Sequence, residues 1–118
     1  MLPLLRARVA SIWSILAEFV AEVTVIKVDY HSFKLRVTLA DGSTVRISEQ
    51  YYQGTLENYA YYWLDADCRL LIGWDNAPHH SHLSSFPHHK HVGSQDNRLP
   101  SEETTPEDVL ESIRAQLS

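Results

Sequence analysis

Two short stretches on either side of Asp41-Gly42 alternate strictly between apolar and polar residues, which is the pattern of a strand with one buried face. The apolar positions are Phe33, Leu35, Val37 and Leu39 in the first stretch, and Val45 and Ile47 in the second. A two-residue turn would place polar residues opposite apolar ones. A three-residue turn, Ala40 to Gly42, pairs Val37 with Val45 and Leu35 with Ile47. We therefore predict this register, with Gly42 at a positive φ angle.

Helical patterns stand at both ends of the chain. Residues 4–20 carry apolar residues at spacings of three and four, and Pro3 is compatible with the start of a helix. A second helix is predicted after Thr105, whose side chain can cap the first turn, and Pro106 fits that turn. Its apolar stripe extends to Leu117. We interpret both stripes as faces that pack on the core.

Further strands are predicted between the helices. Residues 23–30 alternate, with a change of phase that indicates a β-bulge near residues 25–26. Residues 58–75 are predicted to form a second hairpin with a four-residue loop at 65–68. This loop pairs Trp63 with Leu70, Tyr61 with Ile72 and Tyr59 with Trp74. Both faces of this hairpin are apolar, which is typical of strands in the centre of a sheet.

The remaining segments have no regular period. Residues 76–93 are interpreted as an ordered loop, and the polar residues 94–105 as a linker to the C-terminal helix. The predicted order is α-β-β-β-β-β-α. Because hairpins place neighbouring strands antiparallel, we predict an α+β fold with a single domain over residues 1–118. It has a mostly antiparallel sheet of about five strands, with helices covering one face.

The composition agrees with one ordinary globular domain. The 118 residues are 44% hydrophobic and 21% charged, which excludes long disorder and collagen. Cys68 is the only cysteine, so a disulfide scaffold is excluded as well. Arg6, Arg8 and Glu18 interrupt the apolar N-terminal stretch, unlike a signal peptide or a membrane span. We therefore expect a cytoplasmic protein that has no membrane partner.

Six of the seven histidines lie between His79 and His91. They fall in two runs, Asp75-Asn76-Ala77-Pro78-His79-His80 and Phe86-Pro87-His88-His89-Lys90-His91. These runs, with Tyr61-Tyr62-Trp63-Leu64-Asp65-Ala66-Asp67 upstream, resemble the TumE family of toxins from bacterial and archaeal toxin–antitoxin systems. Cys68 and Gly73 depart from the family pattern, in which glycine and a larger residue are usual. The resemblance implies a growth-inhibiting toxin whose partner is a cognate antitoxin protein.

The histidines lead to a hypothesis about the chemistry. Histidine transfers protons near neutral pH, and RNA cleavage through the 2′-hydroxyl needs a base, an acid and a cation, but no metal. His80 and His88 are candidates for the acid and base, and Asp75 for orienting an imidazole. His91 and Lys90 are candidates for phosphate contacts. We predict a metal-independent ribonuclease that requires no cofactor, with its catalytic residues among Asp75, His80, His88 and His91.

A metal site is the alternative interpretation. His80-x-His82 and His89-x-His91 each place two imidazoles on one side of an extended segment, and Asp75 can add an oxygen. The candidate ligands are His79, His80, His82, His88, His89 and His91. The chain is then a metal-dependent enzyme, or a non-enzymatic module that binds a divalent metal or a partner. A third interpretation is that the histidines only fix a long loop through hydrogen bonds.

Basic side chains supply a candidate nucleic-acid surface. Lys34, Arg36 and Arg46 share the polar face of the first hairpin, and Lys90 lies among the histidines, so these four can contact RNA phosphates. The simpler interpretation is a solvated sheet face. The net charge of −5 does not exclude RNA, because residues 1–93 carry −1 and residues 94–118 carry −4. Self-association is also compatible with the sequence.

Overall fold

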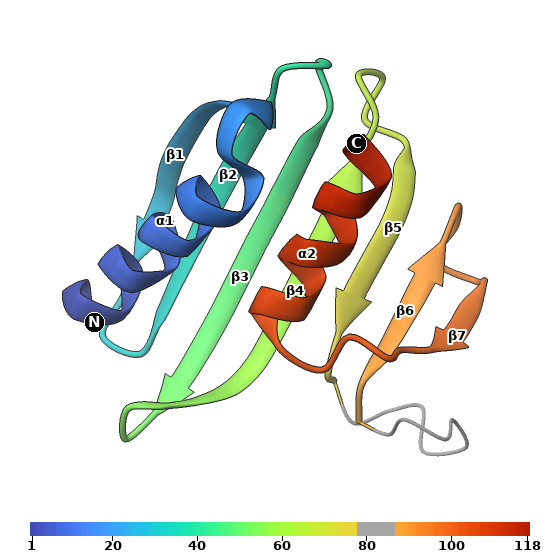
Figure 1. Cartoon of the computed structure of the whole chain (residues 1–118). Helices are drawn as coiled ribbons and strands as arrows, with labels where there is room; N and C mark the ends of the chain where they lie inside the picture. The colour runs from blue at the N-terminus through green and yellow to red at the C-terminus, as the bar shows by residue number, and fades with distance from the viewer. Residues whose placement is uncertain (78–86) are drawn as a thin grey trace.

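The computed structural model describes residues 1–77 and 87–118, in which two helices cover one face of a single sheet (Figure 1). Within these ranges the sheet has seven antiparallel strands, and their spatial order follows the chain. The strands are β1 (Val20–Val28), β2 (Ser32–Leu39), β3 (Thr44–Tyr52), β4 (Thr55–Leu64), β5 (Leu70–Asp75), β6 (His89–Val92) and β7 (Arg98–Pro100). The predicted α+β fold is confirmed, although the predicted number of strands, about five, is too low.

The two helices lie at the ends of the chain, as predicted. The first, α1 (Leu2–Leu16), is shorter than the predicted helix over 4–20. It ends because Ala17 adopts a φ of 43°, and a 3-10 turn, η1 (Ala17–Phe19), then leads into β1. In α2 (Pro106–Leu117), the Asp108 amide donates to the Thr105 hydroxyl at 3.1 Å, which confirms the predicted cap. In the described ranges, neither helix has the length and apolar character needed to span a membrane.

The first hairpin has the predicted register. Val37 lies opposite Val45, and Leu35 lies opposite Ile47. Gly42 has a φ of 89°, as the three-residue turn requires. The pairing of β1 with β2 also shifts between Val25 and Lys27, at the position of the predicted bulge. Apolar alternation and the short turn were sufficient together, because a slip of one residue would move the apolar side chains off the covered face and the turn length excludes larger slips.

The second hairpin has a different register from the predicted one. Tyr61 lies opposite Trp74 rather than Ile72, so the pairing is displaced by two residues. The displacement arises at the turn, where the Asp65 carboxylate accepts hydrogen bonds from the amides of Asp67 and Arg69, both at 2.9 Å. The pairing also shifts between Trp63 and Leu64. Because a shift of two preserves the face of each side chain, the predicted core face remains correct.

The sequence patterns did not predict two of the strands. The strand β6 lies in the segment interpreted as a loop, and β7 lies in the segment predicted as a linker. Both are short, and their polar residues do not alternate with apolar ones. They are held by backbone pairing, with β6 between β5 and β7. Such pairing depends on the neighbouring strand and leaves no period in the sequence itself.

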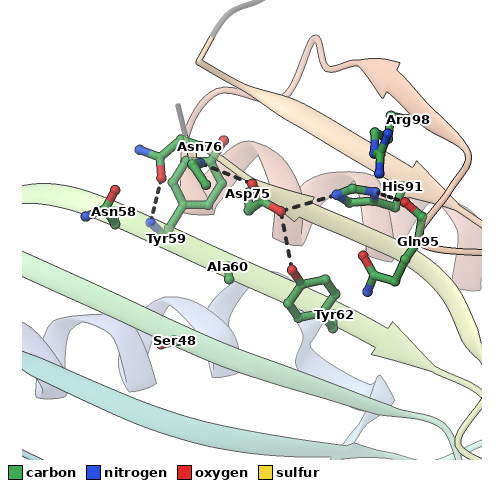
Figure 2. Close-up of a pocket in the computed structure, with 11 residues that line it drawn as sticks. Ser48, Asn58, Tyr59, Ala60, Tyr62, Asp75, Asn76, His91, Gln95 and Arg98 are labelled. Atoms are coloured by element: carbon green, nitrogen blue, oxygen red, sulfur yellow. Dashed lines mark hydrogen bonds and ion pairs between the residues drawn. The ribbon is translucent and has the colours of Figure 1, made fainter. Parts of the chain in front are cut away.

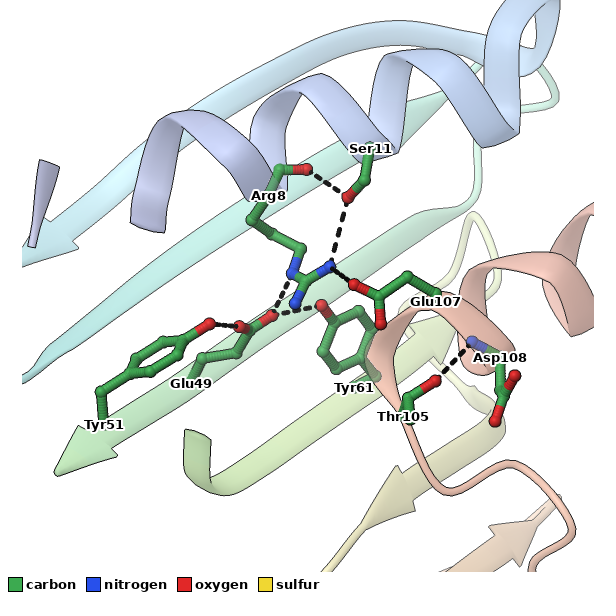
Figure 3. Close-up of polar contacts among 8 residues, drawn as sticks. All are labelled: Arg8, Ser11, Glu49, Tyr51, Tyr61, Thr105, Glu107 and Asp108. Atoms are coloured by element: carbon green, nitrogen blue, oxygen red, sulfur yellow. Dashed lines mark hydrogen bonds and ion pairs between the residues drawn. The ribbon is translucent and has the colours of Figure 1, made fainter. Parts of the chain in front are cut away.

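A buried polar cluster connects the sheet to both helices (Figure 3). The Glu49 side chain on β3 is fully buried, and it accepts a hydrogen bond from Arg8 Nε of α1 at 2.7 Å. Tyr51 donates to its other oxygen at 2.6 Å, and Tyr61 donates to the oxygen that Arg8 contacts. A second nitrogen of Arg8 lies 2.7 Å from Glu107 Oε1, on α2. The carboxylate therefore has a partner on each oxygen, as a buried charge requires.

The two tyrosines remain neutral donors to this carboxylate. Burial, followed by the hydrogen bond to Glu49 and its charge, raises the pKa of Tyr51 to about 12. Burial and the Glu49 charge also raise the pKa of Tyr61. Both hydroxyls therefore keep their protons near neutral pH and continue to satisfy Glu49.

Replacing Glu49 with alanine is expected to lower the free energy of unfolding by about 3–5 kcal/mol, because Arg8 is left buried without its main partner. The double variant with Arg8→Ala should cost less than the sum of the two single changes, since neither charge is then stranded. Urea unfolding of the three variants measures this coupling. Glu22→Ala, which removes an exposed acid on β1, is the control and should change stability little. A double variant whose loss in free energy of unfolding equals the sum of the two single losses would contradict the coupling.

Candidate functional site

The candidate site lies on the face of the sheet that the helices leave open. Asp75 ends β5 and lies opposite His89 of β6, and His91 lies opposite Gly73. Because side chains alternate along a strand, His89 and His91 point to the same face as Asp75. Lys90, between them, points to the face with the helices. Backbone pairing thus gathers three ligand-type side chains from two neighbouring strands.

The Asp75 carboxylate is the centre of the site (Figure 2). Its Oδ1 lies 2.6 Å from His89 Nε2 and accepts a hydrogen bond from the Ala77 amide at 3.1 Å. Its Oδ2 lies 3.4 Å from His91 Nε2 and accepts a hydrogen bond from the Tyr62 hydroxyl at 3.3 Å. All three ligand-type residues are buried. The ligand atoms of Asp75, His89 and His91 lie within 4.8 Å of one another, so these residues can hold a metal ion.

The opposite nitrogens of the two imidazoles face backbone carbonyls. His89 Nδ1 lies 3.2 Å from the Pro87 carbonyl oxygen, and His91 Nδ1 lies 2.9 Å from that of Gln95. A carbonyl oxygen only accepts hydrogen bonds, so in a neutral ring a proton on Nδ1 completes each contact. The contacts hold the orientation of both rings and direct both Nε2 atoms towards Asp75.

A pocket of about 390 Å³ opens beside this centre. Asp75 and His91 line it, together with Tyr62 and with Arg98, which lies opposite His91 on β7 (Figure 2). Burial, then the charge of Asp75 and the hydrogen bond to it, raise the pKa of Tyr62 to about 12. The Tyr62 hydroxyl therefore keeps its proton at neutral pH and donates a hydrogen bond to Asp75. The pocket wall thus combines a carboxylate, an imidazole, a phenol and a guanidinium.

Gly73 makes this arrangement sterically possible. It lies opposite Tyr62 on the neighbouring strand, and a Cβ atom built on Gly73 would lie 2.5 Å from the Tyr62 ring. Real Cβ atoms do not approach so closely, so a side chain at this position would displace the ring. The glycine that departs from the expected family pattern therefore makes room for the tyrosine that contacts Asp75.

The predicted basic residues of the first hairpin lie on the same open face. Lys34, Arg36 and Arg46 are exposed there, with Arg36 directly opposite Arg46. Arg46 in turn lies opposite Tyr62. A second hollow, lined by these three cations, shares Ser48 and Tyr62 with the pocket beside Asp75. Asp75, His89 and His91 together are called the histidine centre. The basic residues and the histidine centre are therefore neighbours on one surface.

Other predicted site residues lie elsewhere. His88 Nδ1 is 2.9 Å from the Tyr59 hydroxyl, and burial lowers the pKa of His88. Lys90 lies 3.7 Å from Glu103 on the side of the sheet that carries the helices, away from the other three cations. His79, His80 and His82 fall in residues 78–86, outside the described residues. Of the four predicted catalytic residues, the described structure brings Asp75 and His91 together.

Three residues of the centre were not predicted in these roles. His89 appeared as a metal candidate, but nothing in the sequence singled it out as the partner of Asp75. Tyr62 was interpreted as part of an apolar face, and the predicted register placed it opposite Leu71 rather than Gly73. Arg98 lies in the segment predicted as a linker, where no pattern marks it. These roles arise from strand pairing, which joins residues distant in the chain.

Comparison with known protein families identifies this chain's family. A family model described as "Toxin TumE" matches residues 8–117, which is nearly the whole chain. No curated protein and no solved structure matches significantly. The matched range includes both histidines of the centre, the basic hairpin and α2.

Replacing Gly73 with alanine is expected to destabilise the protein by about 1–3 kcal/mol, because the added methyl group overlaps the Tyr62 ring. The same change should cost nothing in a Tyr62→Ala background, where the ring is absent. Thermal or urea unfolding of the two single variants and the double variant tests this. An equal cost of Gly73→Ala in both backgrounds would show that Tyr62 does not lie over Gly73.

Proposed function

This chain belongs to the TumE family of toxins, and we propose that it inhibits growth by binding and cleaving RNA on the open face of its sheet. The observation that carries the proposal is the shared surface of three cations and the histidine centre. The cations contact the phosphate backbone, and the centre acts on a phosphodiester held in the pocket. An antitoxin protein neutralises this activity, in keeping with the family.

The placement of the cations supports a phosphate-binding role. Like charges directly opposite each other on paired strands destabilise a sheet, and Arg36 and Arg46 are such a pair. Among the described residues, the ion pairs do not involve Arg36, Arg46 or Lys34. A polyanion that lies across them would relieve this repulsion. RNA phosphates provide that charge at regular intervals, and Tyr62 beside Arg46 offers a ring on which a base can stack.

The histidine centre is where we place the reaction. Asp75 and His91 line the pocket, and Arg98 adds a positive charge at its wall. A guanidinium can bind phosphate oxygens through two parallel hydrogen bonds and stabilise the charge that develops on them. His88 Nδ1 lies 2.9 Å from the Tyr59 hydroxyl, and the proposal does not use His88 as acid or base. His89 takes its place as the second imidazole beside Asp75.

Replacing Arg36 with glutamate is expected to lower RNA affinity without lowering the stability of the fold. The new carboxylate lies opposite Arg46, so the fold should be as stable as the wild type or more stable by about 0.2–1 kcal/mol. RNA affinity should fall, and the slope of log affinity against log salt should decrease by about 0.7 for each lost contact to single-stranded RNA. Binding of short oligoribonucleotides across a salt series measures both effects.

Arg69→Glu is the matched control for this prediction. It makes the same change of charge at an exposed position in the turn between β4 and β5. RNA affinity should remain close to that of the wild type in this variant. Equal losses of RNA affinity in the two variants would show that net charge, rather than this surface, decides binding. Unchanged RNA affinity in Arg36→Glu would contradict the proposed surface.

Induced expression in bacteria tests the function directly. The chain alone should arrest growth and fragment cellular RNA, and co-expression of its cognate antitoxin should restore growth. His91→Ala should abolish fragmentation while the protein remains folded, as checked by its melting curve. Growth without arrest would contradict a toxin, and arrest with intact RNA would contradict the action on RNA.

A further inference from the structure

We propose that Asp75, His89 and His91 form a binding site for a divalent transition-metal ion, with zinc as the reference case. The three residues come from adjacent strands and converge through one carboxylate and two Nε2 atoms, all within 4.8 Å. Metal–donor distances of about 2.0–2.2 Å place the donors of a tetrahedral site about 3.4 Å apart. The His91 Nε2 to Asp75 Oδ2 distance is already 3.4 Å, whereas His89 Nε2 lies 2.6 Å from Asp75 Oδ1 and must move away from it to reach this separation. Metal binding rests on these ligands alone, and only RNA as the substrate depends on the proposed function.

The hydrogen-bond polarity of the two imidazoles supports a cation between them and Asp75. Each Nδ1 faces a backbone carbonyl, so the proton of a neutral ring resides there. Each Nε2 then presents a lone pair towards a carboxylate, which is also an electron-pair donor. Metal-binding histidines typically show this arrangement, with the outer nitrogen donating to a carbonyl and the inner one on the metal.

The distances in the centre suit a shared ion. His91 Nε2 lies 3.4 Å from Asp75 Oδ2, and His89 Nε2 lies 2.6 Å from Asp75 Oδ1. The two imidazole rings meet edge to face, with their centroids 5.1 Å apart. One metal ion can therefore engage all three donors at once.

The ligand set and its surroundings indicate an open site. Two imidazoles and one carboxylate suit zinc and the other late first-row ions, and three protein ligands leave a position for water or substrate. That position faces the pocket of about 390 Å³, since Asp75 and His91 line it. Arg98 and Tyr62 stand on the same wall. A phosphate oxygen entering the pocket could therefore meet the metal, the guanidinium and the phenol together.

The test uses the full-length, untagged protein after treatment with a chelator. Titration with Co²⁺ should give a visible d–d spectrum that saturates at one ion per chain, and Zn²⁺ should displace it. Zn²⁺ should also raise the melting temperature of the wild type. Asp75→Asn and His91→Ala should each weaken metal binding by at least about 10-fold, since losing a ligand costs more than losing an outer-shell partner.

Two controls make the result specific to this site. His31→Ala, which removes an exposed histidine before β2, should bind Co²⁺ as the wild type does. A variant with His79, His80 and His82 all replaced by alanine should also retain one ion per chain. Absence of Co²⁺ binding by the folded wild type, or binding that survives both Asp75→Asn and His91→Ala, would overturn the proposal. If a ligand variant does not fold, the test rests on two measurements. The wild type and the variant without His79, His80 and His82 should each bind one Co²⁺ ion per chain, and loss of binding in that variant would contradict the site.

The outcomes also separate this inference from the proposed function. RNA cleavage by a folded wild-type protein that binds no Co²⁺ would overturn the metal site and leave the ribonuclease standing. One ion per chain, together with intact RNA in arrested cells, would support the metal site and contradict the ribonuclease.

Discussion

The structure depends on a carboxylate buried where the sheet meets the helices. Taking Glu49 out of water costs several kcal/mol unless its charge is paired and its oxygens are hydrogen-bonded. Arg8 provides the opposite charge, and the hydroxyls of Tyr51 and Tyr61 provide the remaining bonds. Arg8 also reaches Glu107, so one cluster ties α1 and α2 to the same face. The other face of the sheet is left open as a consequence.

That asymmetry determines where the chemistry of the chain is exposed. Strand alternation sends successive side chains to opposite faces, so neighbours in sequence acquire different surroundings. On β6, His89 and His91 reach the open face and meet Asp75, whereas Lys90 reaches the covered side and Glu103. The open face also carries the cations of the first hairpin and the pocket. The proposed RNA surface and the proposed metal site are therefore two parts of one uncovered sheet face.

The predictability of each element depended on how much of its structure is local. The register of β2 with β3 follows from alternation and a short turn, because a slip of one residue would bury polar side chains. In the second hairpin the carboxylate of Asp65 closes a longer turn, and the register moves by two without changing either face. The strands β6 and β7 have no periodic signal, since they rest on backbone pairing with distant residues.

By itself the sequence determined the α+β class, both helices, the core faces and the family resemblance, because periodicity, capping and motifs are properties of contiguous residues. It also indicated that Asp75 and some of the histidines act together. Only the tertiary structure decided which histidines these are among the described residues, and that Tyr62 and Arg98 stand beside them. The reason is physical. Contacts between strands depend on register, and the register of β5 with β6 pairs residues that are distant in the chain, where no periodic pattern in β6 predicts it.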